Sequence, residues 1–165
     1  MNNLEDTQLK NKVISMILSL LMVSMLAACG EDLALTQFKK SMDDFCSKVA
    51  EIDTAINNID AEKENAPDEL LGYLSDLDIV FQSFARLDFP EEFDYLENLA
   101  DEASSYMTEA VKSYKDAYSN DSYNEATAEY ARQNYERANK RIQIILDFLH
   151  GEEPDDENLT IEYSE

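Results

Sequence analysis

Glycine, proline, cysteine and histidine are scarce in this sequence of 165 residues, which contains three Gly, three Pro, two Cys and one His. A sandwich or barrel of many short strands needs frequent turns rich in Gly and Pro, so the composition excludes most all-β folds. One His and two Cys are too few for a zinc or iron–sulfur ligand set. We therefore expect no metal and no bound cofactor, and the absence of a catalytic signature predicts a protein that is not an enzyme.

Basic residues are also few. Thirteen Lys and Arg stand against 36 Asp and Glu, which gives a formal net charge of −23 at pH 7. A field of this sign repels phosphate backbones, so nucleic acid is not an expected partner. Because 44% of the residues are apolar, the chain can still build a core, and we expect one ordered acidic domain.

An apolar run from Val13 to Ala28 follows a polar start that carries Lys10 and Lys12. This order is the layout of a secretion signal. At about 1.5 Å per residue the run makes roughly 24 Å of helix, which is less than the ~30 Å hydrocarbon core that a stable span must cross. We therefore expect residues 1–28 to be a cleaved signal peptide.

The apolar run ends in Leu26, Ala27, Ala28 and Cys29. In these positions the chain resembles bacterial lipoprotein precursors, whose lipobox reads Leu, two small residues and Cys. The resemblance implies cleavage before Cys29, a diacylglycerol or fatty acyl group on its thiol, and a mature protein held on the extracytoplasmic face of the cell membrane. It covers only the leader and the attachment cysteine. The alternative is an uncleaved anchor or a buried helix with a chance match.

Four later segments repeat apolar residues at alternating steps of three and four, which is the period of helices with a heptad seam. The expected helices span about residues 32–64, 67–88, 90–119 and 122–150. The expected seam residues are Leu35, Phe38, Met42, Phe45, Val49, Ile52, Ile56 and Ile59 in the first, Leu70, Leu74, Leu77, Phe81 and Phe84 in the second, Leu96, Ala103, Met107, Ala110, Tyr114 and Ala117 in the third, and Ala128, Ala131, Tyr135, Ala138, Ile142, Ile145 and Leu149 in the fourth.

Several residues mark the expected ends of these helices. Pro67 suits the first turn of the second helix, and Phe89 before Pro90 should end it. Ser122 with Glu125 matches a capping box at the start of the fourth helix. Gly151 is placed to terminate that helix.

Helices of this kind with short connections predict an all-α, antiparallel four-helix bundle in up-down-up-down order over residues 29–151. A three-helix bundle or an oligomeric coiled coil fits the same period. The acid-rich residues 152–165 read as a disordered tail. Leu159, Ile161 and Tyr163 alternate with polar residues, so a short strand added to a partner is the alternative for the tail.

Tyrosines concentrate near the turn that should point away from the membrane. Tyr118, Tyr123 and Tyr130 lie off the seam there, and their flat faces suit a sugar, a peptide or a protein partner. We interpret them as a candidate ligand surface. The alternative is that they belong to ordinary amphipathic helix ends.

The only basic cluster of the mature chain is Arg132, Arg137, Lys140 and Arg141. It is a candidate anion patch, and the alternative is that these side chains form ion pairs with nearby acids. Cys46 falls beside Phe45 in a helical pattern, which indicates a half-buried structural cysteine.

The expected function is that of a membrane-anchored, non-catalytic lipoprotein that binds a protein, peptide or cell-surface ligand. The alternative is an acidic, immunity-like or sequestering protein that captures a cationic toxin or peptide through its net charge. Capture by charge should weaken steeply as ionic strength rises, whereas binding anchored by tyrosines should not.

Overall fold

The computed structural model describes residues 33–118 and 123–152, and all regular structure in these residues is helical. The α-helices are α2 (Leu33–Asn57), α3 (Ala66–Phe84), α4 (Glu97–Tyr118) and α5 (Glu125–Leu149), and a 3₁₀ helix, η1 (Glu91–Leu96), precedes α4. The predicted all-α class is confirmed, and the arrangement is compatible with a helical bundle. The proposed leader with Cys29 and most of the acidic tail lie outside the described residues.

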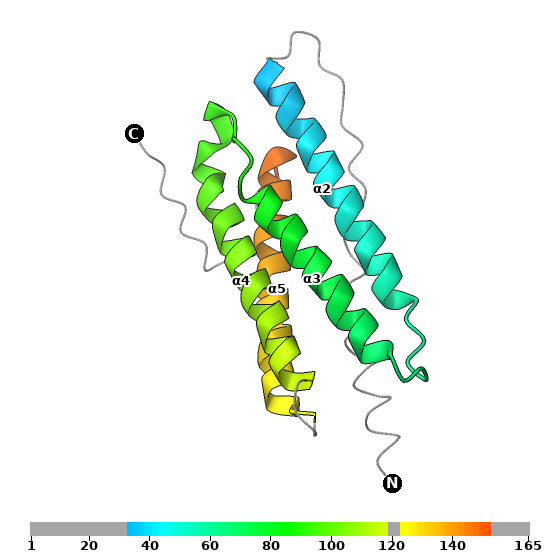
Figure 1. The fold of residues 1–165 in the computed structure, drawn as a ribbon. Helices are drawn as coiled ribbons and strands as arrows, with labels where there is room; N and C mark the ends of the chain where they lie inside the picture. Colours follow the sequence, from blue (N-terminus) through cyan, green and yellow to red (C-terminus); the bar gives the residue numbers. More distant parts are fainter. Residues whose placement is uncertain (1–32, 119–122, 153–165) are drawn as a thin grey trace.

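The helices pack on their neighbours in the chain (Figure 1). α2 lies beside α3, α3 also packs on α4, and the most extensive contact is between α4 and α5. α2 rests mainly on α3 and has few close contacts with α5. None of the described helices combines the length and the hydropathy needed to cross a membrane.

The two helix pairs are packed by different kinds of side chain. Phenylalanine rings fill the space around α2 and α3, where Phe45 stacks on Phe84 with ring centroids 4.4 Å apart and Phe38 meets Phe89 at 4.7 Å. Alanine is frequent among the buried residues of α4 and α5, at Ala100, Ala103, Ala110, Ala117, Ala128, Ala131 and Ala138. Because the distance between helix axes depends on the side chains at the contact, the alanines allow α4 and α5 to approach closely.

The predicted seams describe the core well. All their residues are buried except five that are half-buried, which are Leu35, Ile52, Ile59, Leu70 and Leu149. The seams did not predict that polar Asp53, Ser113 and Asn134 are buried as well.

The first helix ends at Asn57, well before the predicted end near Glu64. Asn side chains compete with the backbone for hydrogen bonds, so Asn57 and Asn58 are a weak place to continue a helix. A turn follows, in which the Glu62 N–H donates to Asp60 Oδ1 at 3.1 Å. Ile59 still packs against the core, but from this turn and not from the helix.

The segment that follows Pro90 is not α-helical from its start. Pro90 is extended, with φ −60° and ψ 150°, and residues Glu91–Leu96 form η1 before α4 begins at Glu97. Apolar residues recur here every third position, at Phe93, Leu96 and Leu99, which matches the three residues per turn of a 3₁₀ helix. The predicted single helix over 90–119 is therefore wrong at its N-terminal end.

The second and fourth helices also start or end at residues other than those predicted. α3 contains Pro67 in its first turn, as predicted, but ends at Phe84 rather than near residue 88. The N-cap of α5 is Asn124, whose Oδ1 accepts the Thr127 N–H at 3.1 Å. The capping box predicted at Ser122 is therefore not the start of this helix, and Ser122 lies outside the described residues.

The C-terminal end of α5 follows the prediction. Gly151 has φ +73°, a conformation that glycine adopts without a Cβ penalty. The Glu152 N–H donates to the Asp147 carbonyl at 2.8 Å and the Gly151 N–H donates to the Phe148 carbonyl at 3.0 Å. This pair of bonds is a Schellman motif, which satisfies carbonyls at the end of the helix.

Candidate functional site

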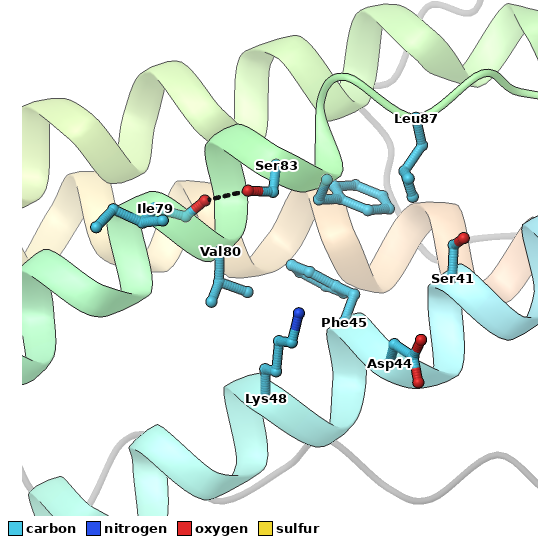
Figure 2. Close-up of a pocket in the computed structure, with 9 residues that line it drawn as sticks. Ser41, Asp44, Phe45, Lys48, Ile79, Val80, Ser83 and Leu87 are labelled. Atoms are coloured by element: carbon cyan, nitrogen blue, oxygen red, sulfur yellow. Dashed lines mark hydrogen bonds between the residues drawn. The ribbon is translucent and has the colours of Figure 1, made fainter.

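A surface pocket of about 240 Å³ lies between α2 and α3 (Figure 2). The buried rings of Phe45 and Phe84 contribute to its floor. Val80 and Leu87 are half-buried beside them, and Ile79 lies at the edge. The pocket therefore offers an apolar surface to a ligand.

The helical period of α3 explains why apolar side chains reach this pocket. Leu77, Phe81 and Phe84 point into the core, and Ile79 falls between them on the outer face with 61% of its surface exposed. A single exposed apolar residue is ordinary on a protein surface. This one lines the same pocket as the half-buried Val80 and Leu87.

Polar side chains form the rim of the pocket. Ser41, Asp44 and Lys48 come from α2 and Ser83 comes from α3. The Ser83 hydroxyl donates to the Ile79 carbonyl at 2.8 Å, so its proton is already used within the helix. A ligand can therefore meet hydroxyl oxygens as well as one acid and one base.

Asp44 and Lys48 are one helical turn apart, a spacing that favours an ion pair. Within the described residues neither side chain takes part in a salt bridge, and Figure 2 shows the Lys48 ammonium directed toward Phe45 and Val80 while the Asp44 carboxylate points elsewhere. Both charges are therefore available to a ligand at this rim.

The size of the pocket limits what it can hold. Sites for drug-sized molecules enclose about 300–1,000 Å³. A pocket of about 240 Å³ suits one apolar side chain of a larger partner better than a whole small molecule. The pocket offers apolar contacts, hydrogen bonds and charges to a ligand, so we interpret it as a binding site.

The structure partly assembles the predicted tyrosine surface. The rings of Tyr118 and Tyr123 are in contact, with centroids 5.1 Å apart. Tyr123 is 36% exposed and Tyr130 is 48% exposed. Tyr114 lies close by in the core. Burial raises the pKa of its hydroxyl well above the ordinary value, and the neighbouring Tyr118 and Tyr123 add smaller increases. An aromatic cluster is thus present at this end of α4, whereas Tyr130 has no ring contact with it among the described residues.

The predicted anion patch is largely neutralised by the chain's own acids. Arg132 forms ion pairs with Glu129 at 2.5 Å and with Glu136, and Arg141 pairs with Glu102 at 2.5 Å. Hydrogen bonds from Arg132 and Gln133 lower the pKa of Glu129 to about 2. These contacts favour the interpretation in which the arginines form ion pairs with nearby acids.

The other two residues of that patch differ from each other. The Arg137 and Arg141 guanidinium groups each lie 5.7 Å from the centroid of the Tyr106 ring, which is a cation–π distance. Lys140 is exposed on α5. The four residues share one helix, but the structure does not bring them together around an open anion site.

Asp53 is one of the three buried polar residues that the seams did not predict. It is only 9% exposed, and its Oδ1 has no hydrogen-bond partner. Its carboxyl group lies near the side chain of Tyr135 on α5. A signal was present in the sequence, because Asp53 follows Val49 by four residues and precedes Ile56 by three, the seam spacing itself.

Burial dominates the ionisation of this pair. It raises the pKa of Asp53 to about 7, and the nearby Tyr135 side chain opposes the rise. Burial also raises the pKa of Tyr135 well above its ordinary range, and the negative charge of Asp53 adds to the rise. Asp53 is therefore a carboxyl group that can change its charge near neutral pH.

Cys46 has the half-buried position that was predicted for it. Burial, followed by the charge of Asp43, raises the pKa of its thiol to about 11. A thiol with this pKa is a poor nucleophile at neutral pH. Cys46 therefore fits a structural role.

Over residues 33–118 and 123–152 there is no group of three or more His, Cys, Asp or Glu that could hold a metal ion. Leu26, Ala27, Ala28 and Cys29, the residues of the lipobox resemblance, are outside these ranges. No protein family, curated protein or solved structure matches the chain.

Proposed function

We propose that this chain is a lipoprotein, anchored through Cys29 to the extracytoplasmic face of a cell membrane, that binds a protein, peptide or cell-surface ligand and catalyses no reaction. The observation that carries the binding function is the apolar pocket between α2 and α3, with Ile79 exposed at its edge. The lipobox residues carry the anchoring.

The position of α2 supports the anchoring. This helix begins at Leu33, a few residues after Cys29, and Leu33 is 71% exposed. In the up-down-up-down order that we propose, the start of α2 and the end of α5 face the membrane together. Figure 1 supports this order, because the blue start of α2 and the orange end of α5 lie toward the same end of the molecule.

The pocket favours a peptide or protein ligand. Its volume suits one apolar anchor residue, and Asp44 and Lys48 can pair with charges on either side of that residue. Anchor residues in well-packed pockets contribute much of the affinity of protein interfaces. The tyrosine cluster at Tyr118 and Tyr123 is a second surface of the same proposed function.

Palmitate labelling in bacterial cells tests the anchor. The full chain should incorporate label and partition into membranes, and the Cys29→Ala variant should do neither. Equal labelling and equal membrane partition of the two proteins would contradict the anchoring.

Cross-linking to cell-surface material tests the pocket. The wild type should capture a partner that Ile79→Asp captures at least tenfold less, because a charge would lie at the apolar edge. Leu33→Asp is the matched control, since it places the same charge at an exposed leucine outside the pocket. Equal capture by the wild type and Ile79→Asp would exclude the pocket as the binding site.

The acidic surface favours a second candidate function, which is capture of a cationic toxin or peptide. The net charge is −23, and Arg132 and Arg141 are already paired with the chain's own carboxylates. Steering by net charge is screened within about 8 Å at physiological salt. Capture that falls steeply between 50 mM and 500 mM salt would favour this function, and capture independent of salt would favour the apolar pocket.

A further inference from the structure

A single buried carboxyl group of α2 lies near α5, a helix that α2 touches little. Asp53 on α2 is close to Tyr135 on α5, whereas α2 rests mainly on α3. Ile56, one turn after Asp53, is fully buried, so this part of α2 faces the core. The state of the carboxyl group therefore bears directly on how α2 is held.

The carboxyl group is poorly supplied with hydrogen bonds for an ionised acid. Oδ1 is buried without a partner, and burial of an unpaired ionised oxygen is strongly unfavourable. A protonated carboxyl group avoids most of this penalty. A neutral Asp53 therefore allows α2 to stay packed against the core, which we call its seated position. A charged Asp53 destabilises that position.

No fixed charge compensates for an ionised Asp53. From α5 it faces Tyr135, and Tyr114 of α4 lies near that hydroxyl. Among the described residues, no charged side chain of α2, α3, α4 or α5 acts on the carboxyl group, whose ionisation responds to burial and to Tyr135. Deprotonation thus has no counter-ion in this part of the core.

We propose that Asp53 and Tyr135 form a proton-dependent latch, which keeps α2 seated when Asp53 is protonated and favours its release when Asp53 is ionised. Only the effect of the latch on ligand binding rests on the proposed function, because Asp44, Phe45 and Lys48 of the pocket belong to α2. Release of α2 would dismantle one wall of the pocket, so pH would regulate ligand binding there.

The direction of the effect follows from the two states. Burial raises the pKa of Asp53 from 3.8 to about 7 in the seated state, and release returns it toward the lower value. Release of α2 therefore liberates a proton between about pH 4 and pH 7, and its equilibrium constant rises up to about tenfold per pH unit in that window. Above about pH 7 both states are ionised and the effect levels off.

Hydrogen exchange of the full chain in detergent, followed by mass spectrometry of α2 peptides, tests the latch. A released helix of this length is marginal in water, so its amides should exchange. After correction for intrinsic rates, exchange of α2 relative to α4 should rise at least tenfold from pH 5 to pH 7 in the wild type. In Asp53→Asn this rise should be absent.

Two further variants make the result specific. Asp44→Asn removes an exposed acid from the same helix and should keep the wild-type pH dependence. Tyr135→Phe removes the hydroxyl group that lowers the pKa of Asp53, so the rise should continue to higher pH before it levels off. A pH dependence that is the same in the wild type and Asp53→Asn would overturn the latch.

The exchange experiment needs no ligand, so the latch and the proposed function can fail separately. Loss of the pH dependence in Asp53→Asn together with equal capture by Ile79→Asp would retain the latch and reject the pocket. Reduced capture by Ile79→Asp with no effect of Asp53→Asn on exchange would do the reverse.

Discussion

Asp53 on α2 and Tyr135 on α5 lie close together inside the core, and one oxygen of the Asp53 carboxyl group is buried without a hydrogen-bond partner. Seam positions of heptad helices usually hold apolar residues. An acid at such a position lowers the stability of the fold whenever it is charged. The pair therefore links the packing of two helices to proton concentration.

The first prediction concerns stability and pH. Because burial raises the pKa of Asp53 from 3.8 to about 7, its stabilising contribution is complete below about pH 4 and is lost as the pH rises to about 7. At 1.36 kcal/mol per pKa unit, Asp53→Asn should be more stable than the wild type at pH 8 by up to about 4 kcal/mol. Urea unfolding at pH 8 and pH 4 measures the difference, which should nearly vanish at pH 4.

The second prediction separates the floor of the pocket from its edge. Phe84 is 2% exposed and stacks on Phe45, so Phe84→Ala should lower the free energy of unfolding by about 3–5 kcal/mol. Ile79→Ala should change it by less than about 0.5 kcal/mol, because the Ile79 side chain is mostly exposed. Similar effects of both substitutions in chemical denaturation would contradict the structure of the pocket.

The third prediction concerns the start of α5. The Asn124 side chain caps this helix by accepting the Thr127 N–H, so Asn124→Ala should cost about 0.5–2 kcal/mol of stability. Asn65 precedes α3 and makes no such capping bond, which makes Asn65→Ala the matched control with a smaller expected effect. An equal loss in the two variants, measured by thermal unfolding, would argue against the cap.

The fourth prediction concerns Cys46. Burial raises the pKa of its thiol from 9.0 to about 11, which reduces the thiolate population at pH 8 by about a hundredfold. Iodoacetamide should therefore modify Cys46 about a hundredfold more slowly in the folded chain than in urea. Peptide mass spectrometry gives the rate at Cys46 itself. Equal rates would show that the thiol is not shielded.

The apolar spacing predicted the helices and their inner faces, because this information lies within each segment. Phe38, Met42 and Phe45 follow one stripe, and the structure buries all three. Helix ends were harder to predict. The stripe continues to Ile59, but the asparagines at 57 and 58 end α2 first, and Ile59 reaches the core from a turn.

The candidate site was less predictable than the helices. Phe45 and Phe84 were assigned to the core, and Ile79 fell outside every seam. Only the alignment of α2 against α3 brings these three residues to one pocket. The tyrosines and arginines were visible as clusters in the sequence, but their partners, such as Glu102 opposite Arg141, come from another helix.

The sequence by itself determined the helical class, the apolar stripes and the large negative charge, because each depends on composition or on spacing within one segment. The tertiary structure decided that α2 and α3 enclose a pocket and that Asp53 is buried against Tyr135. Both depend on how far each helix is rotated and shifted against its neighbours. That rotation and shift come from fitting large rings around α2 and α3 and alanines between α4 and α5, which no single stripe specifies.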